Sequence, residues 1–383
     1  MSGVLIDELL VFSDHHGHPF SYGSKEVLLP TDLFRSTSDV LYNSRLIESC
    51  RVIKQMEEYA RKNNIKSAVF CGDLFHTQEA VPTEAFNLTL RSIRSLAQQC
   101  KLYLLVGNHD SADRLGQVHS LEAFRLVPNV EVFGWESKSL TINHSGRLDT
   151  YTMCFVPYSD RKQLIKSTIQ AHSTAGCEPR LLFAHLGIQG AKVGSDYVLI
   201  NENDLSIDDI PTKGFAGCLF GHFHEHQQLF QNGWYVGATH HHNWGDVNTK
   251  RGFLHVRVYI NSIEFDFIES DAPRFLAINE RDLEQVSIRE KDFVKVFTEK
   301  KMTDSEIKKV RSAAKSENCE VVYIPPDVRI QIHELNDQNL SPTAMVETWV
   351  KAHSDWLKEH LPEVNHTELV EYGKKILTKV ENV

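Results

Sequence analysis

The sequence lacks long apolar runs and any excess of basic residues. Its longest apolar runs, such as residues 102–106, fall far short of the roughly 18 residues that a membrane-spanning helix needs. No basic segment precedes the apolar residues at the N-terminus, so we expect no secretory signal and no membrane association. The net charge of −10 argues against broad nucleic-acid binding by bulk positive charge. A nucleic-acid enzyme stays possible, because a carboxylate-rich metal site adds negative charge that bound cations neutralise.

Paired cysteines are also missing. The seven cysteines are scattered and no C-x-x-C pair occurs, which argues against a disulfide framework and against a zinc knuckle. Several fall in expected strands, where a thiol acts as a small apolar filler. We therefore expect a reducing, cytoplasmic compartment. What the sequence has instead is histidine, with 20 in 383 residues.

Short apolar strands alternate with amphipathic helices through most of the chain. Helices are expected at residues 44–63 and 83–99, where apolar residues recur with helical spacing. Strands are expected at residues 4–14, 67–71, 102–106, 153–156, 181–184 and 218–220. This alternation predicts an α/β fold with a mostly parallel or mixed sheet. The segment 17–39, which has no expected strand or helix, is long for a connection and is expected to be functional or mobile.

The pattern changes from residue 273 onward. A strand at 293–297, a helix at 304–317 and a strand at 320–324 predict a small separate α/β unit. Two helical stretches follow at 344–360 and 367–380, with Trp349 and Trp356 on the first. We therefore predict three domains, at residues 1–272, 273–340 and 341–383. The apolar faces of the last two helices could pack on their own domain or on a partner, and the aromatic residues favour a partner.

Five polar clusters follow the ends of apolar strands, in the order D-x-H, G-D, G-N-H-D, H and G-H-x-H. Ligand sites in open α/β sheets lie at that edge. Because residues i and i+2 of a strand point to one side, Asp14 and His16 can reach one metal while His15 faces away. Each motif alone is weak and could be a polar strand end, but five in order predict a site. The candidate metal ligands are Asp14, His16, Asp73, Asn108, His185, His222 and His224.

This donor set contains two carboxylates, one amide oxygen and four imidazoles. Mixed nitrogen and oxygen ligands suit Mn²⁺, Fe²⁺ or Zn²⁺ better than Mg²⁺ or Ca²⁺. Seven ligands exceed what one tetrahedral ion takes and fit two divalent ions about 3.5–4 Å apart, with Asp73 as the natural bridge. Such a pair binds a scissile phosphate and supplies a nucleophile near neutral pH. His109, beside Asn108, is placed to stabilise or protonate the leaving alkoxide.

As a set, these motifs resemble the calcineurin-like metallophosphoesterase superfamily, over roughly residues 5–265. The resemblance implies a two-sheet sandwich flanked by helices. It also implies that Asp14, His16 and His224 join the bridging Asp73 at one metal. Asn108, His185 and His222 would join Asp73 at the other, and His109 would be the transition-state histidine.

Within the superfamily, Gly72-Asp73-Leu74-Phe75-His76 resembles the DNA double-strand-break repair nucleases of the SbcD type, as do residues 234–238, 243–246 and 250–253. The resemblance implies a Mn²⁺-dependent DNA exonuclease and endonuclease in which His76 contacts the DNA backbone. It further implies a homodimer, an SMC-like ATPase partner of the SbcC type, a capping domain at 273–340 and ATPase-binding helices at 341–383. The compartment would then be a bacterial cytoplasm, or the host cytoplasm for a phage protein.

Some features depart from that pattern, and other functions stay open. Residues 17–39 are longer than expected, Asp14-His15-His16 replaces the more usual leucine- or tryptophan-containing version, and His240-His241-His242 has no family role. We expect these three histidines to form a solvated loop, with a DNA-contacting loop as the alternative. A protein phosphatase would show substrate-binding arginines that are missing here, and a cyclic-nucleotide phosphodiesterase would not need the C-terminal residues. A non-enzymatic scaffold of the same fold would have lost metal ligands, and none is lost.

Overall fold

The computed structural model describes the chain in segments that divide into two compact units. One unit comprises residues 1–277, 288–294 and 316–318, and the other comprises 278–287, 295–315 and 319–383. The predicted domain boundaries at 272 and 340 stay predictions. The described residues, apart from the side chains of 193, 197–198 and 375–381, are 4–34, 39–78, 80–113, 116–143, 150–174, 179–193, 197–198, 204–260, 262–324, 346–347, 350–351, 354 and 365–381.

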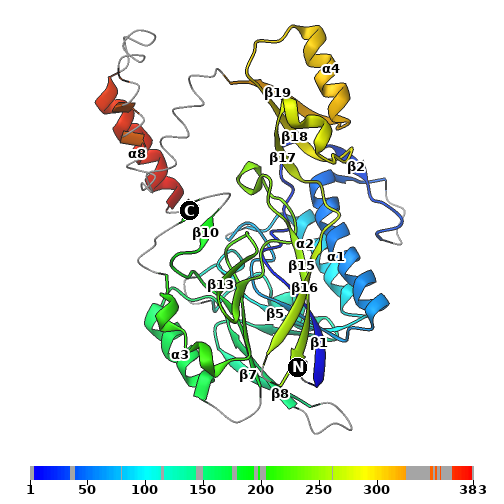
Figure 1. Cartoon of the computed structure of the whole chain (residues 1–383). Coiled ribbons are helices and arrows are strands. Elements are labelled where there is room, and N and C mark those ends of the chain that lie inside the picture. The colour runs from blue at the N-terminus through cyan, green and yellow to red at the C-terminus, as the bar shows by residue number, and fades with distance from the viewer. Residues whose placement is uncertain are drawn as a thin grey trace. The chain divides into compact units, whose positions relative to one another are not determined.

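Two six-stranded mixed sheets form the first unit (Figure 1). In the first sheet the order is β16 (Ile263–Glu269), β15 (Gly252–Tyr259), β1 (Leu5–Phe12), β4 (Ser67–Phe70), β5 (Lys101–Leu105) and β6 (Val130–Phe133). In the second it is β13 (Gln227–Phe230), β14 (Gly233–Tyr235), β12 (Gly217–Gly221), β9 (Arg180–His185), β8 (Thr150–Val156) and β7 (Lys138–Asn143). Strands β1, β4, β5 and β6 run parallel, as do β8, β9, β12 and β14.

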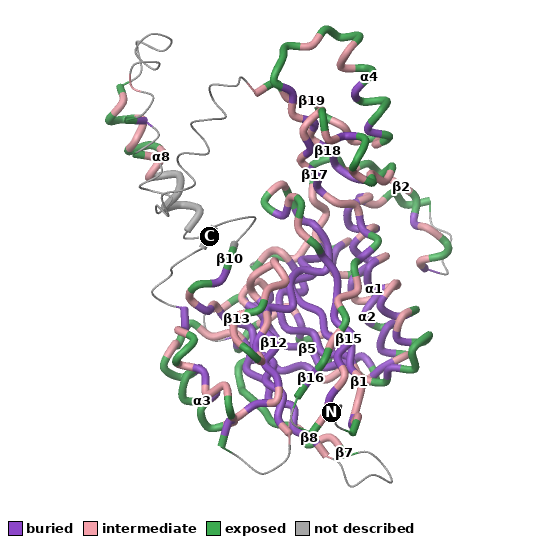
Figure 2. Tube along the Cα trace, viewed as in Figure 1, coloured by how far each residue is buried: buried purple, intermediate pink, exposed green. Residues whose placement is uncertain are grey.

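The core lies in three layers because successive side chains of a strand point to opposite faces. Leu9 and Val11 of β1 pack between the two sheets, against residues such as Phe183 of β9. Leu10 and Phe12 face the other way, toward the helices. A third cluster covers the outer face of the second sheet. Figure 2 shows the buried residues concentrated in the strands of both sheets. The predicted two-sheet sandwich flanked by helices is confirmed.

Helices cover the outer faces of the two sheets. On the first sheet lie α1 (Ser44–Asn63) and α2 (Thr83–Leu96), side by side (Figure 1). On the second lies α3 (Lys162–Thr174). The predicted helix at 44–63 has these bounds because Asn43 caps it, accepting hydrogen bonds from two backbone N–H groups, and Asn64 ends it with φ 57°. The predicted helix at 83–99 ends earlier, at Leu96.

A smaller sheet and two helices follow. Its strand order is β17 (Phe275–Asn279), β18 (Phe293–Thr298) and β19 (Asn318–Tyr323), and the boundary between the two units falls within each of these strands. The helix α4 (Asp304–Ala314) ends three residues before the predicted 317, because Lys315 adopts φ 53°. The last helix is α8 (His366–Glu381), close to the predicted 367–380. Most of the predicted helix 344–360, with Trp349 and Trp356, lies outside the described residues.

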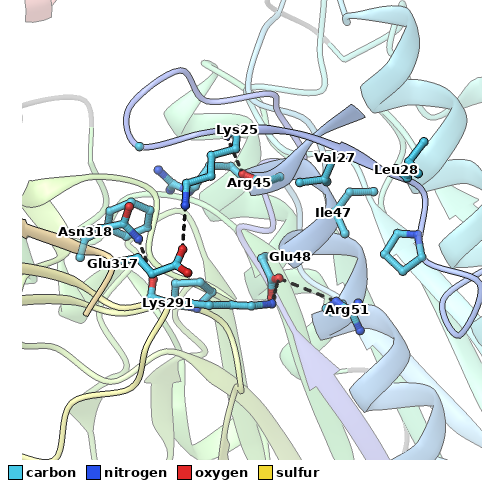
Figure 3. A pocket seen from close by; sticks show the side chains of 15 residues that line it. Lys25, Val27, Leu28, Arg45, Ile47, Glu48, Arg51, Lys291, Glu317 and Asn318 are labelled. Carbon is cyan, nitrogen blue, oxygen red and sulfur yellow. Dashed lines mark hydrogen bonds and ion pairs between the residues drawn. The ribbon is translucent and has the colours of Figure 1, made fainter. Parts of the chain in front are cut away.

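Residues 17–34 of the predicted long connection pack onto the first unit. Within the wider segment, β2 (Glu26–Leu28) pairs with β3 (Leu41–Asn43). Gly23, with φ +64°, must be glycine because a Cβ there would lie 2.1 Å from the Phe293 ring. Figure 3 shows the cavity beside this segment, of about 270 Å³, in which Lys25 pairs with Glu317 at 2.7 Å and Lys291 with Glu48 at 2.5 Å. These cations are neutralised by partners in the first unit.

Asp292 connects Arg274, just before β17, with Arg289, a few residues before β18. Its carboxylate is fully buried and accepts hydrogen bonds from the backbone and side chains of both Arg274 and Arg289, including one of 2.6 Å from Arg274. Burial alone would raise the pKa of Asp292, but these hydrogen bonds outweigh it and hold that pKa below its usual 3.8.

We predict that Asp292→Asn lowers the free energy of unfolding by about 2 kcal/mol at pH 7. The substitution removes the buried anion that the partly exposed guanidinium groups of Arg274 and Arg289 contact. The contribution of Asp292 is fully present above pH 3.8, the unfolded value, and is lost as the pH falls through the lower folded pKa. Urea unfolding at pH 7 and below pH 3.8 measures both effects, with the exposed Asp271→Asn as control. An equal loss at every pH would contradict this account.

Among the described residues, no helix has the length and apolar character needed to cross a bilayer.

Candidate metal centre

The first half of the centre is built where β1 and β4 end. β1 stops at Phe12, so Asp14 and His16 do not continue the strand as predicted. Both adopt left-handed backbone conformations, with φ 49° and 47°, and Asp73 does the same with φ 64°. The backbone N–H of Asp14 donates to Gly72 O and that of His16 to Asp73 O. These hydrogen bonds hold the strained residues in place, and strain of this kind concentrates at functional sites.

Gly72 gives the second motif its tight turn. Its φ is +102°, and a Cβ there would lie 2.2 Å from Nδ1 of His185. The loop that follows is held by Asp110, whose carboxylate accepts hydrogen bonds from the backbone N–H groups of Asp73, Leu74 and Phe75 at 2.9–3.1 Å and from that of Gly107 at 3.1 Å. In the sequence Asp110 stands out only by its place in the third motif. The structure makes it the clamp that fixes both loops.

One group of predicted ligands gathers around His16. Its Nε2 lies 3.7 Å from Oδ2 of Asp73 and 3.2 Å from Nε2 of His224. Asp14, His16 and Asp73 each offer a ligand atom within 4.8 Å of the others. Asp14 also accepts the backbone N–H of His222 at 3.0 Å, which ties the end of β12 to the end of β1.

The second group gathers around His185, at the end of β9. Its Nε2 lies 3.4 Å from Oδ2 of Asp73 and 2.9 Å from Oδ1 of Asn108. Nδ1 of His222 lies 3.1 Å from the same Asn108 oxygen. Nδ1 of His185 lies 2.7 Å from the carbonyl oxygen of Cys71; donation there leaves the Nε2 lone pair for a ligand role. His222 and His224 therefore point to different groups, unlike two residues on one face of a strand.

The structure thus brings all seven predicted ligands together in two groups that share Asp73. Their role as ligands stays a prediction. Two fully buried carboxylates, Asp14 and Asp73, lie here, and among the described residues neither forms an ion pair with Lys or Arg.

Burial lowers the pKa of His222 to about 3 and that of His16 well below its usual value, so these two imidazoles are neutral. Burial acts the same way on His185 and His224, but Asp73 raises the pKa of His185 to about 9 and Asp246 raises that of His224. A bound cation would take the place of the protons on these two rings, because a metal ligand must be a neutral imidazole. Two divalent ions fit this donor set, and their charge would offset that of the buried carboxylates.

His109 and His76 lie beside His16, with ring centroids 4.8 and 5.3 Å from its ring, and are half-buried. The backbone N–H of His109 donates to Oδ1 of Asp73 at 2.8 Å, and its Nδ1 donates to the carbonyl oxygen of His76 at 2.7 Å. Its ring therefore keeps Nε2 for a substrate. The two rings stack with centroids 5.6 Å apart, and Nδ1 of His76 lies 3.4 Å from Nδ1 of His16.

Two features near His224 were missed or wrongly predicted from the sequence. Oδ1 of Asp246 lies 3.6 Å from Nδ1 of His224 and 2.7 Å from the Arg251 guanidinium. Burial would raise the pKa of Asp246, but His224 and Arg251 hold it far below its usual value. The only sequence signal was its place in the stretch 243–246. A carboxylate behind an imidazole orients that ring.

The predicted solvated loop at His240-His241-His242 is wrong, because all three residues are buried. Ala238 pairs with Ser13 and its backbone N–H donates to His224 O, which draws the tripeptide inside. His15 does face away from the two groups, as predicted. Its Nδ1 bonds Thr239 Oγ1 at 2.9 Å, and Thr239 in turn bonds His240.

The comparisons with known proteins agree with this geometry. The calcineurin-like phosphoesterase family matches residues 8–226, more than half of the chain. A protein of Invertebrate iridescent virus 6 described as a phosphoesterase, 244L, is 25% identical over 187 residues, or 48% of this chain and 61% of the relative. A similarly described protein of Invertebrate iridescent virus 3, 078R, is 23% identical over 217 residues, or 56% of this chain and 58% of the relative.

A third relative is exonuclease subunit 1 of Enterobacteria phage T4, 25% identical over 207 residues, which are 52% of this chain and 56% of the relative. The chain thus spans about three fifths of the length of the curated relatives it matches. The family match begins within β1 and includes the last G-H-x-H ligand, His224. On this evidence the chain belongs to the calcineurin-like phosphoesterase family of metal-dependent hydrolases.

Proposed function

We propose that this protein is a DNA nuclease that hydrolyses phosphodiester bonds with two divalent cations, Mn²⁺ being the expected metal. The observation that carries the proposal is the convergence of seven donor side chains in two groups about Asp73, with His109 beside them. Two such cations, when bound, supply Lewis-acid chemistry to a phosphate ester. The match to a phage protein named as an exonuclease subunit supports DNA as the substrate.

The residues around the donors support a phosphodiester rather than a phosphomonoester substrate. His109 presents Nε2 to the leaving oxygen, because Nδ1 is engaged by His76 O. His76 stacks on His109 and gives the site a second imidazole for a backbone phosphate. The arginines that would hold a phosphomonoester dianion in a protein phosphatase are missing from the second and third motifs.

The experiment compares labelled duplex DNA, single-stranded DNA, an aryl phosphomonoester and a cyclic nucleotide, each with and without Mn²⁺. We expect degradation of duplex ends that requires Mn²⁺ and stops when a chelator is added, and little monoester hydrolysis. Fast hydrolysis of the monoester with the DNA left intact would show a phosphatase instead of a nuclease. Hydrolysis of the cyclic nucleotide alone would show a cyclic-nucleotide phosphodiesterase. Activity on none of these substrates, with both ions bound, would favour a non-enzymatic scaffold.

We also propose that the chain works as a homodimer with an SMC-like ATPase of the SbcC type, with residues 273–340 capping the DNA and 341–383 binding the ATPase. What supports the ATPase contact is α8, where Tyr372 is 65% exposed beside the half-buried Leu369 and Val370. Truncation after Pro342 should abolish co-purification with the ATPase and leave nuclease activity intact. Unchanged co-purification would reject the contact. Light scattering on the full chain alone tests the dimer.

A further inference from the structure

His242 is a buried imidazole that the family's ligand set does not use. Its side chain is 2% exposed, and neither ring nitrogen has a hydrogen-bond partner among the described residues. The nearest acidic oxygen, Oδ2 of Asp246, lies 3.9 Å from Nδ1, beyond hydrogen-bond range. A buried polar group without a partner is destabilising. An imidazole that keeps both nitrogens unsatisfied in a core needs a reason.

The reason lies in what surrounds it. His16, His224 and His242 each offer a ring nitrogen within 4.8 Å of the others. The His242 ring stands nearly perpendicular to the other two, with centroids 4.9 Å from His16 and 4.8 Å from His224. Three imidazoles whose nitrogens converge in this way form a ligand cluster, since imidazole is the commonest side-chain ligand of transition metals.

The position of His242 is fixed by the same groups that fix His224. Its backbone N–H donates to Oδ2 of Asp246 at 2.7 Å, while Oδ1 of that carboxylate faces Nδ1 of His224. On its other side the ring stacks against Phe20, with centroids 5.8 Å apart, which shields it from solvent. The Asp246 carboxylate therefore fixes the positions of both His224 and His242. Residues that hydrogen-bond a metal ligand from behind orient it in this way.

We propose that His242 is an additional ligand of the cation held by His16 and His224, so that this position has three imidazoles and the two carboxylates Asp14 and Asp73. The inference rests on the proposed two-cation centre. It has a chemical consequence, because imidazole ligands favour Co²⁺, Ni²⁺ and Zn²⁺ over Mn²⁺. The His16 position should bind such ions more tightly than the His185 position, whose ligands include an amide oxygen.

The test is a titration of the full-length metal-free chain with Co²⁺ and with Mn²⁺, followed by calorimetry and, for Co²⁺, by its visible absorption. His242→Phe keeps a buried ring and removes the ligand. His240→Phe makes the same change two residues away, at a ring that lies 5.2 Å from His15 and 4.7 Å from His242, so it keeps an aromatic ring against His242 and leaves His242 in place. We expect two Co²⁺ per chain in the wild type and in the His240 variant. In His242→Phe, one of the two should bind about 10–100-fold more weakly, with a changed spectrum and a smaller preference for Co²⁺ over Mn²⁺.

Several results would overturn the inference. If His242→Phe binds both ions as the wild type does, His242 is a packing residue. If it loses DNA affinity while both ions bind normally, His242 contacts substrate instead. If the wild type binds no ion, the centre itself is wrong. Failure of the nuclease proposal looks different: DNA stays intact although the His242 variant shows the expected loss of one ion. Thermal unfolding of the metal-free variants shows whether each is folded.

Discussion

Replacing Asp73 by asparagine should abolish phosphodiester hydrolysis, with a loss of at least about 10³-fold. Losing one electrostatic interaction with the reacting phosphate costs about 10²–10³-fold in rate. Losing Asp73 weakens two such interactions, because both donor groups share this residue. An amide is a much weaker ligand than a carboxylate, so we expect calorimetry to show both ions bound more weakly. The variant should still fold, because asparagine keeps an oxygen to accept the His109 N–H.

The matched control is Asp208→Asn, which makes the same change at an exposed position. It should leave both metal binding and cleavage unchanged. If Asp73→Asn bound two ions as tightly as the wild type, Asp73 would not be the bridge. Circular dichroism of the metal-free variant shows whether it is folded. If it is unfolded, its loss of activity does not test ligation, and Asp73→Glu replaces it in the comparison.

The His109→Ala variant should lose cleavage by about 10²–10⁴-fold while still binding two ions. This range is typical for removal of a group that transfers a proton in the transition state. Metal binding should survive because the Nδ1 atom of His109 is engaged by the His76 carbonyl oxygen, and its backbone contact to Asp73 is kept in alanine. Elemental analysis and initial rates on duplex DNA measure the two quantities separately.

The leaving group distinguishes proton transfer from other roles of His109. A phosphodiester that releases a nitrophenolate needs no proton on the departing oxygen, so His109→Ala should hydrolyse it nearly as fast as the wild type does. An equal loss on both substrates would make His109 a stabiliser of phosphate charge instead. Loss of an ion in this variant would make it a ligand, since His109 lies in a cluster with His16 and His76. His172→Ala on α3 is the control.

Much of this protein could be predicted from its sequence. The helix at 44–63 was predicted with the bounds that the structure has, because its apolar spacing and its capping asparagines are local signals. The alternation of strands and helices predicted the α/β class for the same reason. The chemistry of the donors could also be predicted, because the type of a side chain fixes what it can ligate wherever it lies.

The rest was decided by tertiary structure, because it depends on which strand lies beside which. The parallel pairing of β1 with β4, and of β9 with β12, sets Asp14 beside Asp73 and His185 beside His222. The left-handed backbone at Asp14 and His16 follows from hydrogen bonds to residues more than fifty positions away. Those long-range contacts also bury His242 and bring it to His16. Residue type thus set the chemistry, and only the packing of distant strand ends set where each donor points.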